Sequence, residues 1–143
     1  MTYRHILLAA DFSPDTSAVT ERARSLAGNG TRITLVHVIE PLALAYGAEM
    51  PVDLGSLQEE ISRQARARLD ELGGKLGVID GDRVLATGSI AREILRIATE
   101  RDVDLIVLGS HSRRGLAALL GSTANAVLHH AGCDVLAVRI AKN

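Results

Sequence analysis

Aromatic residues are scarce in this chain of 143 residues, which has one phenylalanine, two tyrosines and no tryptophan. Proteins that bind single-stranded nucleic acid often stack bases on aromatic side chains, so this shortage argues against such a platform. An excess of one charge is lacking too, because 16 Lys and Arg face 17 Asp and Glu, for a formal net charge of -1. We therefore expect no nucleic-acid partner and no attraction to an anionic membrane.

Cysteine and long apolar runs are also in short supply. Cys133 is the single cysteine, which excludes an internal disulfide and fits a reducing compartment. The apolar run before Asp11 spans only six residues, too few for a signal-peptide core or a membrane span. We therefore expect a cytoplasmic protein, and the length predicts one domain over residues 1–143.

Five short apolar segments predict strands, and most of them are continuous, as expected for strands that are buried on both faces. They cover residues 5–10, 33–38, 83–87, 104–108 and 134–140. Helical segments with capping signals lie between them. Ser13 with Pro14 predicts the start of the first helix, and Gly28 predicts its end. Ser56 with Glu59 forms a capping box for the longest helix.

Glycines and a serine delimit the remaining helices. We expect the longest helix to end among Gly73, Gly74 and Gly77, Ser89 to cap a third helix, and a fourth to begin near Gly121. Strict alternation of strands and helices predicts a doubly wound α/β domain with a parallel sheet and helices on both faces. Residues 40–55 form the one long irregular stretch, and we expect this loop to form a flap beside a site.

The segment 109–123 places glycines and hydroxyls between a strand and a helix. Gly109 ends the fourth predicted strand, while Gly121, Ser122 and Thr123 open the last helix. Because a helix N-terminus has unpaired N–H groups and a partial positive charge, this segment is suited to hold a phosphate. The alternative is purely structural, since glycines suit turns and hydroxyls cap helices without any ligand.

Asp11 follows the first strand, and ligands of open α/β sheets bind beyond the carboxyl ends of strands. Its carboxylate suits an exocyclic amine or a ribose, but it equally suits the N-terminus of the first helix. Arg113 and Arg114 can grip a phosphate or simply lie in solvent, and His111 can carry a proton or stabilise a turn. Metal-ligand spacings, a P-loop, a dinucleotide fingerprint and a nucleophile elbow are all absent from the sequence.

These residues resemble the universal stress protein family over essentially the whole chain. The segments HILLAADFS, VHVIEP, GSHS and GSTANAVLHHAGCDVLAV resemble the family's segments in the same order. The resemblance implies a five-stranded parallel sheet in the order 3-2-1-4-5, which brings the first and fourth strands together. It also implies a site for ATP, with Mg²⁺, or for AMP.

The resemblance assigns roles to individual residues. Asp11 and the backbone of Val38 would hold adenine and ribose, and phosphates would lie on a set comprising Gly109, Ser110, Ser112, Arg113, Gly121, Ser122 and Thr123. Two features depart from the family's ATP pattern: Ser112 stands where a glycine belongs, and the interval before Gly121 is one residue short. That shorter interval is similar to the branch of the enterobacterial founding member, a dimer without bound nucleotide, so both alternatives stay open.

The last apolar segment, from Asp134 to Ile140, predicts a sheet edge without proline, and such an edge invites pairing with a second copy. We therefore predict a homodimer through this strand that acts by binding a nucleotide or a protein partner. No general base or carboxylate pair stands near segment 109–123, so we expect no catalytic residue and at most slow ATP hydrolysis. A receiver domain is disfavoured, because Thr87 and Gly88 stand where the acceptor aspartate belongs.

Overall fold

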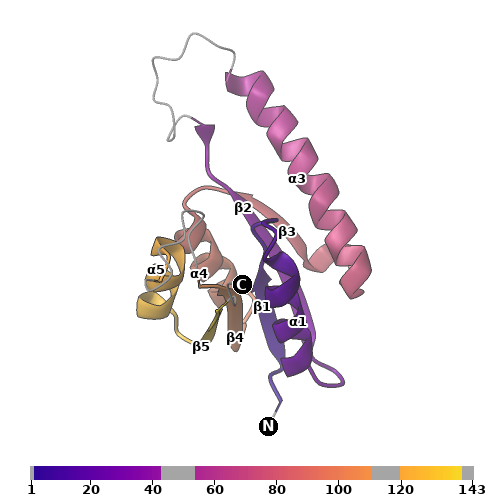
Figure 1. The fold of residues 1–143 in the computed structure, drawn as a ribbon, viewed down its shortest axis with the longest axis vertical. Coiled ribbons are helices and arrows are strands. Elements are labelled where there is room, and N and C mark those ends of the chain that lie inside the picture. Colours follow the sequence, from indigo (N-terminus) through magenta and orange to yellow (C-terminus); the bar gives the residue numbers. More distant parts are fainter. Residues whose placement is uncertain (1, 43–53, 111–119, 140–143) are drawn as a thin grey trace.

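The computed structural model describes residues 2–42, 54–110 and 120–139, and a five-stranded parallel sheet forms its centre (Figure 1). The strands are β1 (His5–Ala9), β2 (Arg32–Ile39), β3 (Arg83–Thr87), β4 (Leu105–Gly109) and β5 (Asp134–Val138). Their order is β3-β2-β1-β4-β5, and each neighbouring pair is parallel. The predicted doubly wound sheet in the order 3-2-1-4-5 is confirmed.

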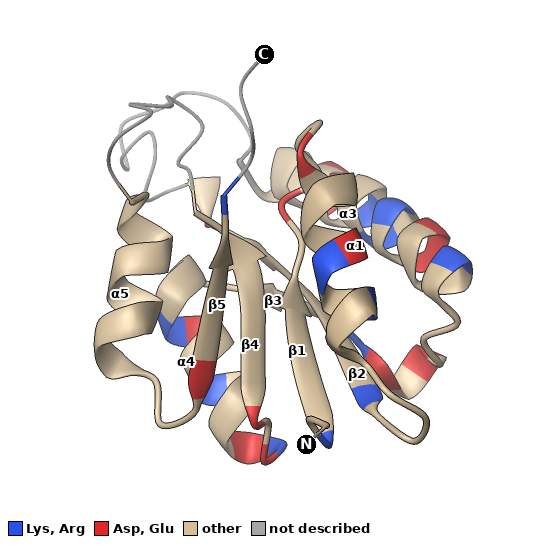
Figure 2. Cartoon of the chain, turned by 60° about the horizontal axis from the view of Figure 1, so that its bottom comes forward, with Lys and Arg blue, Asp and Glu red and all other residues tan. Residues whose placement is uncertain are grey.

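Helices cover both faces of this sheet (Figure 2). One face carries α1 (Thr16–Leu26) and α3 (Leu54–Leu76), and the other carries α4 (Ile90–Glu100) and α5 (Ser122–His130). In β1, Ile6 and Leu8 pack in the core beneath α1 and α3, whereas Leu7 packs in the core beneath α4 and α5. All three are at most 1% exposed, which explains why the apolar runs are continuous rather than alternating.

The first helix begins later than Ser13 and Pro14 predict. Its first residue is Thr16 and its N-cap is Asp15, whose side chain makes no capping bond. The Ser13 hydroxyl instead accepts a hydrogen bond from the Asp15 N–H at 3.2 Å, within the turn that precedes the helix. The prediction that Ser13 caps this helix is therefore wrong. Gly28 also does not close the helix, because Ala27 is the C-cap in an extended conformation.

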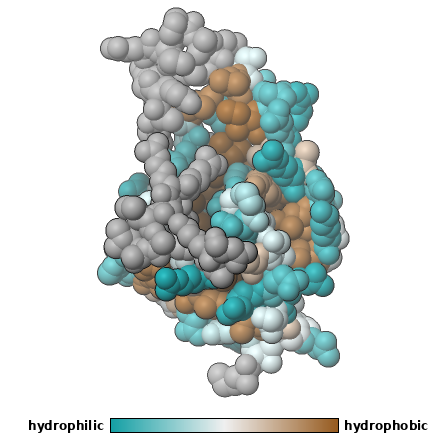
Figure 3. Space-filling model, in the orientation of Figure 1, coloured by the Kyte–Doolittle hydropathy of each residue, from teal (hydrophilic) through white to brown (hydrophobic). Residues whose placement is uncertain are grey.

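The longest helix, α3, begins at Leu54, so Ser56 lies inside it and the predicted capping box was wrong. Because α3 begins at Leu54, the last two residues of the predicted irregular stretch 40–55 are helical. Residues 43–53 of that stretch lie outside the described residues. The outer side of α3 is hydrophilic, and its apolar side chains lie toward the sheet (Figure 3). Ala65 and Leu69 are buried on that inner side.

Of the three glycines at which the longest helix is predicted to end, Gly77 is the one that ends α3. Its φ of +71° is left-handed, and the N–H groups of Val78 and Gly77 donate to the carbonyls of Gly73 and Gly74 at 2.9 and 3.3 Å. These two bonds form a Schellman motif. A side chain at Gly73 is disfavoured for another reason, because a Cβ there would collide with the Arg83 side chain.

The remaining boundaries lie close to the predictions. Helix α4 follows its N-cap Ser89 as predicted, although the Ser89 hydroxyl makes no capping bond, and the Ser89 carbonyl accepts the first helical bond from the Glu93 N–H at 2.9 Å. Strand β5 ends at Val138, and the predicted end at Ile140 lies outside the described residues. Among the residues that the structure describes, no helix has the length and apolarity needed to cross a membrane.

Candidate functional site

The winding of the sheet reverses between β1 and β4, which are direct neighbours. Their register pairs Leu8 with Val107, so the chain leaves β1 beside the end of β4 at Gly109. Crossovers from these two strands run to opposite faces, because β1 leads to α1 and β4 leads to α5. In doubly wound sheets such a switch point leaves a crevice for a ligand.

Ser110 is the most constrained polar residue at this switch point. Its N–H donates to the carbonyl of Val138 at 2.9 Å, and its carbonyl accepts from the Gly121 N–H at 2.7 Å. These bonds join β4 to the end of β5 and to the start of α5. Ser110 is only 6% exposed, yet its Oγ has no hydrogen-bond partner within the described part of the chain. A buried hydroxyl without a partner costs about 1–3 kcal/mol, so a ligand that bonds to it would remove a penalty.

Helix α5 directs its N-terminus to the same place. Gly121 is its extended N-cap, and Ser122 and Thr123 are its first two residues, with no side-chain capping bond. The first bond across this cap runs from the Asn125 N–H to the Gly121 carbonyl at 2.9 Å. The N–H groups before Asn125 have no intrahelical acceptor, as in any first turn. The predicted start of this helix is confirmed.

Gly109 is a glycine that its described surroundings do not require. Its φ is not left-handed, and a Cβ at this position would make only an ordinary contact of 3.6 Å with Val19. Within the described residues, neither the backbone conformation nor the packing requires a glycine at this position.

Asp11 has a structural task at the entry to α1. Its Oδ1 accepts hydrogen bonds from the Ser13 N–H at 3.0 Å and the Thr16 hydroxyl at 3.2 Å. Partial burial acts to raise the pKa of Asp11, but the bonds from Ser13 and Thr16 outweigh it, and the pKa lies below its usual value. Asp11 thus has the structural role that is one of its two predicted roles, at the N-terminus of the first helix. Both of these hydrogen bonds end on Oδ1.

Phe12 and His37, near the end of β1, are not predicted as site residues from the sequence. Phe12 has a φ of +59°, a conformation that a bulky residue adopts at a cost, and its ring lies 4.4 Å from that of His37. The Nδ1–H of His37 donates to the Ala10 carbonyl at 2.6 Å. Backbone strain of this kind leaves no sequence signal, because phenylalanine does not mark left-handed positions. It fixes the direction in which the chain leaves β1.

Val38 lies on β2, with its side chain in the core beneath α4 and α5. The Ala10 N–H donates to the Val36 carbonyl, and the Gly88 N–H donates to the Ile39 carbonyl. Because backbone groups alternate in direction along a strand, the N–H and carbonyl of Val38 point to the β1 side, just beyond the end of β1. Ser112 and Arg113, the other two predicted site residues, lie outside the described residues.

The amino end of the sheet has the opposite character, because its buried polar groups are paired. Asp82, in η1 (Asp80–Asp82), is 5% exposed and binds Arg32 at 2.6 Å and Arg101 at 3.2 Å. The bonds from Arg32 lower the pKa of Asp82, against a smaller opposing effect of burial. His5, 6% exposed, bonds to the Arg101 carbonyl at 3.0 Å and to the Thr34 hydroxyl at 2.6 Å, and burial lowers its pKa.

Metal ligands do not gather at either end: no group of three or more His, Cys, Asp or Glu side chains among the described residues has the geometry to hold a metal ion. The polar groups near the switch point at the carboxyl end include the hydroxyls of Ser110, Ser122 and Thr123, backbone N–H groups and the carboxylate of Asp11. Together they suit hydrogen bonding to an anion and to a sugar or a base rather than direct metal coordination.

A parallel sheet with polar groups at its switch point defines a doubly wound α/β protein with a candidate small-ligand site. Residues 2–139 match the universal stress protein family. Universal stress protein A homolog 1 of Coxiella burnetii (strain RSA 493 / Nine Mile phase I) is 41% identical over 140 residues, which cover 96% of this chain and 97% of the relative. The chain belongs to the universal stress protein family.

Solved structures share this fold. The hypothetical protein MJ0577 superposes with a TM-score of 0.83 at 24% identity, with both chains fully covered. A universal stress protein in complex with cAMP superposes with a TM-score of 0.60 at 20% identity, over 96% of this chain and 98% of the other. At these identities the likeness establishes the architecture.

Proposed function

We propose that this universal stress protein is a cytoplasmic homodimer that binds an adenine nucleotide, ATP with Mg²⁺ or AMP, beyond the carboxyl ends of β1 and β4. The buried hydroxyl of Ser110, which has no hydrogen-bond partner among the described residues, carries the proposal, because the Ser110 carbonyl is bonded to the Gly121 N–H at the start of α5. The phosphates would lie on Ser110, Gly121, Ser122 and Thr123. The adenosine part would reach the carboxylate of Asp11 and the backbone of Val38. The cAMP complex of a protein with this fold supports a nucleotide as the ligand class.

Calorimetry on the purified protein tests this directly. The protein is first denatured and searched by mass spectrometry for released nucleotide, then titrated with ATP and AMP with and without Mg²⁺, and with cAMP as a third ligand. Heat of binding for ATP or AMP supports the proposal. Neither released nucleotide nor heat with any of the three ligands would overturn the nucleotide site.

The alternative is a universal stress protein dimer that binds no nucleotide, and the sequence around Ser112 favours it. A side chain at a position where the ATP pattern has glycine limits close approach of the backbone to phosphates. Replacing Ser112 with glycine is therefore expected to tighten ATP binding, about tenfold if one steric conflict of about 1.4 kcal/mol is relieved. Ser122→Gly serves as the comparison, because it removes a hydroxyl from the same site and should not tighten binding. Unchanged affinity for ATP in Ser112→Gly would contradict the steric argument.

The dimer is expected to form through β5, which is an edge of the sheet with partly buried Val135, Leu136 and Ala137. An edge strand without charges inside it pairs readily with another strand. Light scattering at micromolar concentration is expected to give the mass of two chains. A sharply monomeric mass over the whole concentration range would contradict the dimer and leave the nucleotide site to calorimetry.

A further inference from the structure

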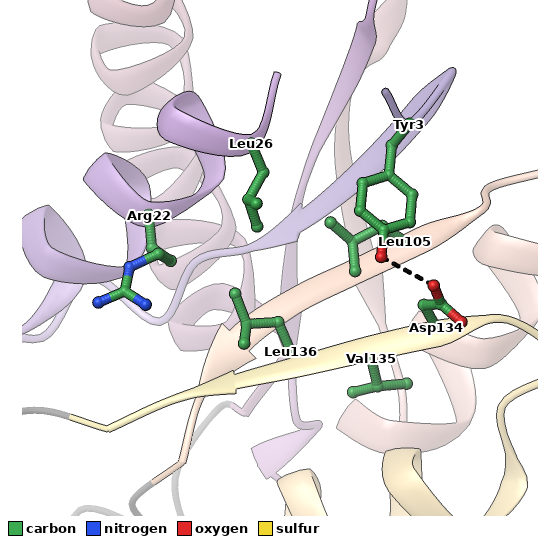
Figure 4. Close-up of a pocket in the computed structure, with 7 residues that line it drawn as sticks. All are labelled: Tyr3, Arg22, Leu26, Leu105, Asp134, Val135 and Leu136. Atoms are coloured by element: carbon green, nitrogen blue, oxygen red, sulfur yellow. Dashed lines mark hydrogen bonds between the residues drawn. The ribbon is translucent and has the colours of Figure 1, made fainter. Parts of the chain in front are cut away.

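A shallow groove of about 440 Å³ runs along β5 on the face that α1 covers (Figure 4). Its lining residues are Tyr3, Arg22, Leu26, Leu105, Asp134, Val135 and Leu136. Leucine side chains form its apolar middle, and its two ends carry opposite charges. Asp134 lies at the end where β5 begins, and Arg22 lies at the end toward which β5 runs. Neither side chain forms an ion pair with the described residues.

The backbone of β5 defines how a second strand can pair with it. The Ser110 N–H donates to the Val138 carbonyl at 2.9 Å, so the backbone groups of Val138 point inward to β4. Because these groups alternate along a strand, Val135 and Ala137 point their N–H and carbonyl groups outward. These two residues offer the hydrogen bonds of the free edge.

A two-fold axis at this edge pairs β5 antiparallel with the β5 of a second copy. The register that uses both outward residues of each strand sets Val135 opposite Ala137 of the second copy. Leu136 then faces Leu136 of the second copy across the axis. In this register Asp134 of the second copy lies beside Val138, at the end of the groove that holds Arg22.

We propose that Arg22 of each copy pairs with Asp134 of the other, so that the two grooves join into one trough across the dimer axis. This inference rests on the proposed β5 dimer and adds its register and its charged contacts. The side chains of Asp134 and Leu136 lie on the face that α1 covers, and a two-fold axis perpendicular to the sheet keeps that face on one side for both copies. Tyr3 donates to Oδ2 of Asp134 at 2.7 Å, which orients the carboxylate and leaves Oδ1 for the guanidinium.

A charge-reversal cycle tests the ion pairs. Sedimentation equilibrium measures the dimer dissociation constant of the full chain, of Arg22→Glu, of Asp134→Arg and of the double variant. Each single variant is expected to weaken the dimer about tenfold, since two like-charge contacts replace two ion pairs, and the double variant is expected to recover to within about threefold of the wild type. Arg24→Glu, on the same helix but outside the groove lining, is the matched control and is expected to change the constant little.

Cysteine cross-linking tests the register separately. In a Cys133→Ser background, Leu136→Cys is expected to form a covalent dimer on mild oxidation, because opposed residues of an antiparallel pair lie within disulfide reach. Ala137→Cys is expected not to, because each copy of it lies two residues from the other along the strands. A dimer that shows no coupling in the charge cycle, or that cross-links at 137 and not at 136, would overturn this inference while the dimer stands. A wild-type monomer at about 100 μM would overturn both, and the nucleotide site would still be judged by calorimetry.

Discussion

At the scale of single residues, the hydroxyls of this protein differ sharply in their surroundings. In the sequence, Ser110 follows a predicted strand and Ser122 and Thr123 open a predicted helix, and all three belong to the predicted phosphate-binding set. The structure separates them, because Ser110 is buried with both backbone groups bonded and its Oγ has no partner among the described residues, whereas Ser122 lies exposed on the helix. Burial depends on the packing of β5 and α5 around Ser110, which no local pattern encodes.

Ser110→Ala separates binding from folding. Removing a buried hydroxyl that lacks a partner is expected to leave the free energy of unfolding unchanged or to raise it by up to about 1 kcal/mol. The same change is expected to weaken adenine nucleotide binding about tenfold, measured by calorimetry, because the ligand loses a hydrogen bond. Thr20→Val is the matched control, since Thr20 on α1 also has a buried unpartnered hydroxyl. If both variants bind nucleotide as the wild type does, Ser110 is not a ligand residue.

His5 makes stability depend on pH. Burial lowers its pKa, so the folded state favours the neutral ring, which bonds to the Arg101 carbonyl and the Thr34 hydroxyl. This contribution is complete above the unfolded pKa of about 6.5 and is lost as the pH falls below it, with a slope of at most about 1.4 kcal/mol per pH unit. Urea unfolding at pH 7.5 and at pH 5.5 measures the loss.

The exposed His129 supplies the control for this titration. His129→Gln is expected to keep the stability loss between pH 7.5 and pH 5.5, whereas His5→Gln is expected to remove most of it along with part of the stability itself. Asp82 and Asp104 titrate in a lower window, because their pKa values lie below the usual aspartate value. An equal pH slope in wild type and His5→Gln would contradict the assignment.

At the scale of elements, α3 shows how well glycines in a sequence predict the end of a helix. The glycines after its apolar stripe correctly predict the region where it ends, and Gly77 ends it through a left-handed φ. Gly73 and Gly74 look the same in the sequence but are helical. A Cβ at Gly73 would displace the Arg83 side chain from β3, and a local pattern cannot reveal this contact between distant segments.

The three glycines are expected to respond differently to alanine. Gly74→Ala is expected to raise the free energy of unfolding by about 0.5–1 kcal/mol, because the helix gains propensity and no atom lies within 4 Å of the new Cβ. Gly77→Ala is expected to lower it by about 1 kcal/mol, because alanine is strained at a positive φ. Gly73→Ala is expected to be destabilising as well, since Arg83 must move. Chemical denaturation gives all three values, and Gly81→Ala, with open space and no positive φ, is the neutral control.

At the scale of the whole molecule, the two ends of the sheet have different chemistry. Continuous apolar runs and strict alternation were sufficient to predict the layers, and the resemblance to the universal stress proteins supplied the strand order. The polar organisation was not predictable in the same way. The amino end joins Asp82, Arg32, Arg101 and His5 from separate segments, and only the folded chain brings them together.

A variant at the amino end should therefore affect stability without affecting the site. Asp82→Asn replaces a buried carboxylate that binds two arginines, and it is expected to lower the free energy of unfolding by about 1–3 kcal/mol. Nucleotide affinity is expected to stay within about twofold of the wild type, because the site lies at the other end of the strands. Glu100→Gln, which weakens an exposed pair with Arg96, is the control for loss of an acidic charge. A large drop in affinity in Asp82→Asn would show that the two ends are coupled.

The local structure around Gly109 predicts which residues evolution accepts at this position. Because its conformation and its described neighbours tolerate a Cβ, folding alone places little constraint on this position. Natural variation at residue 109 should then follow the ligand rather than the fold. Lineages that keep a nucleotide should keep the glycine, and lineages that lose the nucleotide should drift to alanine or serine, whereas Gly77 should persist in both.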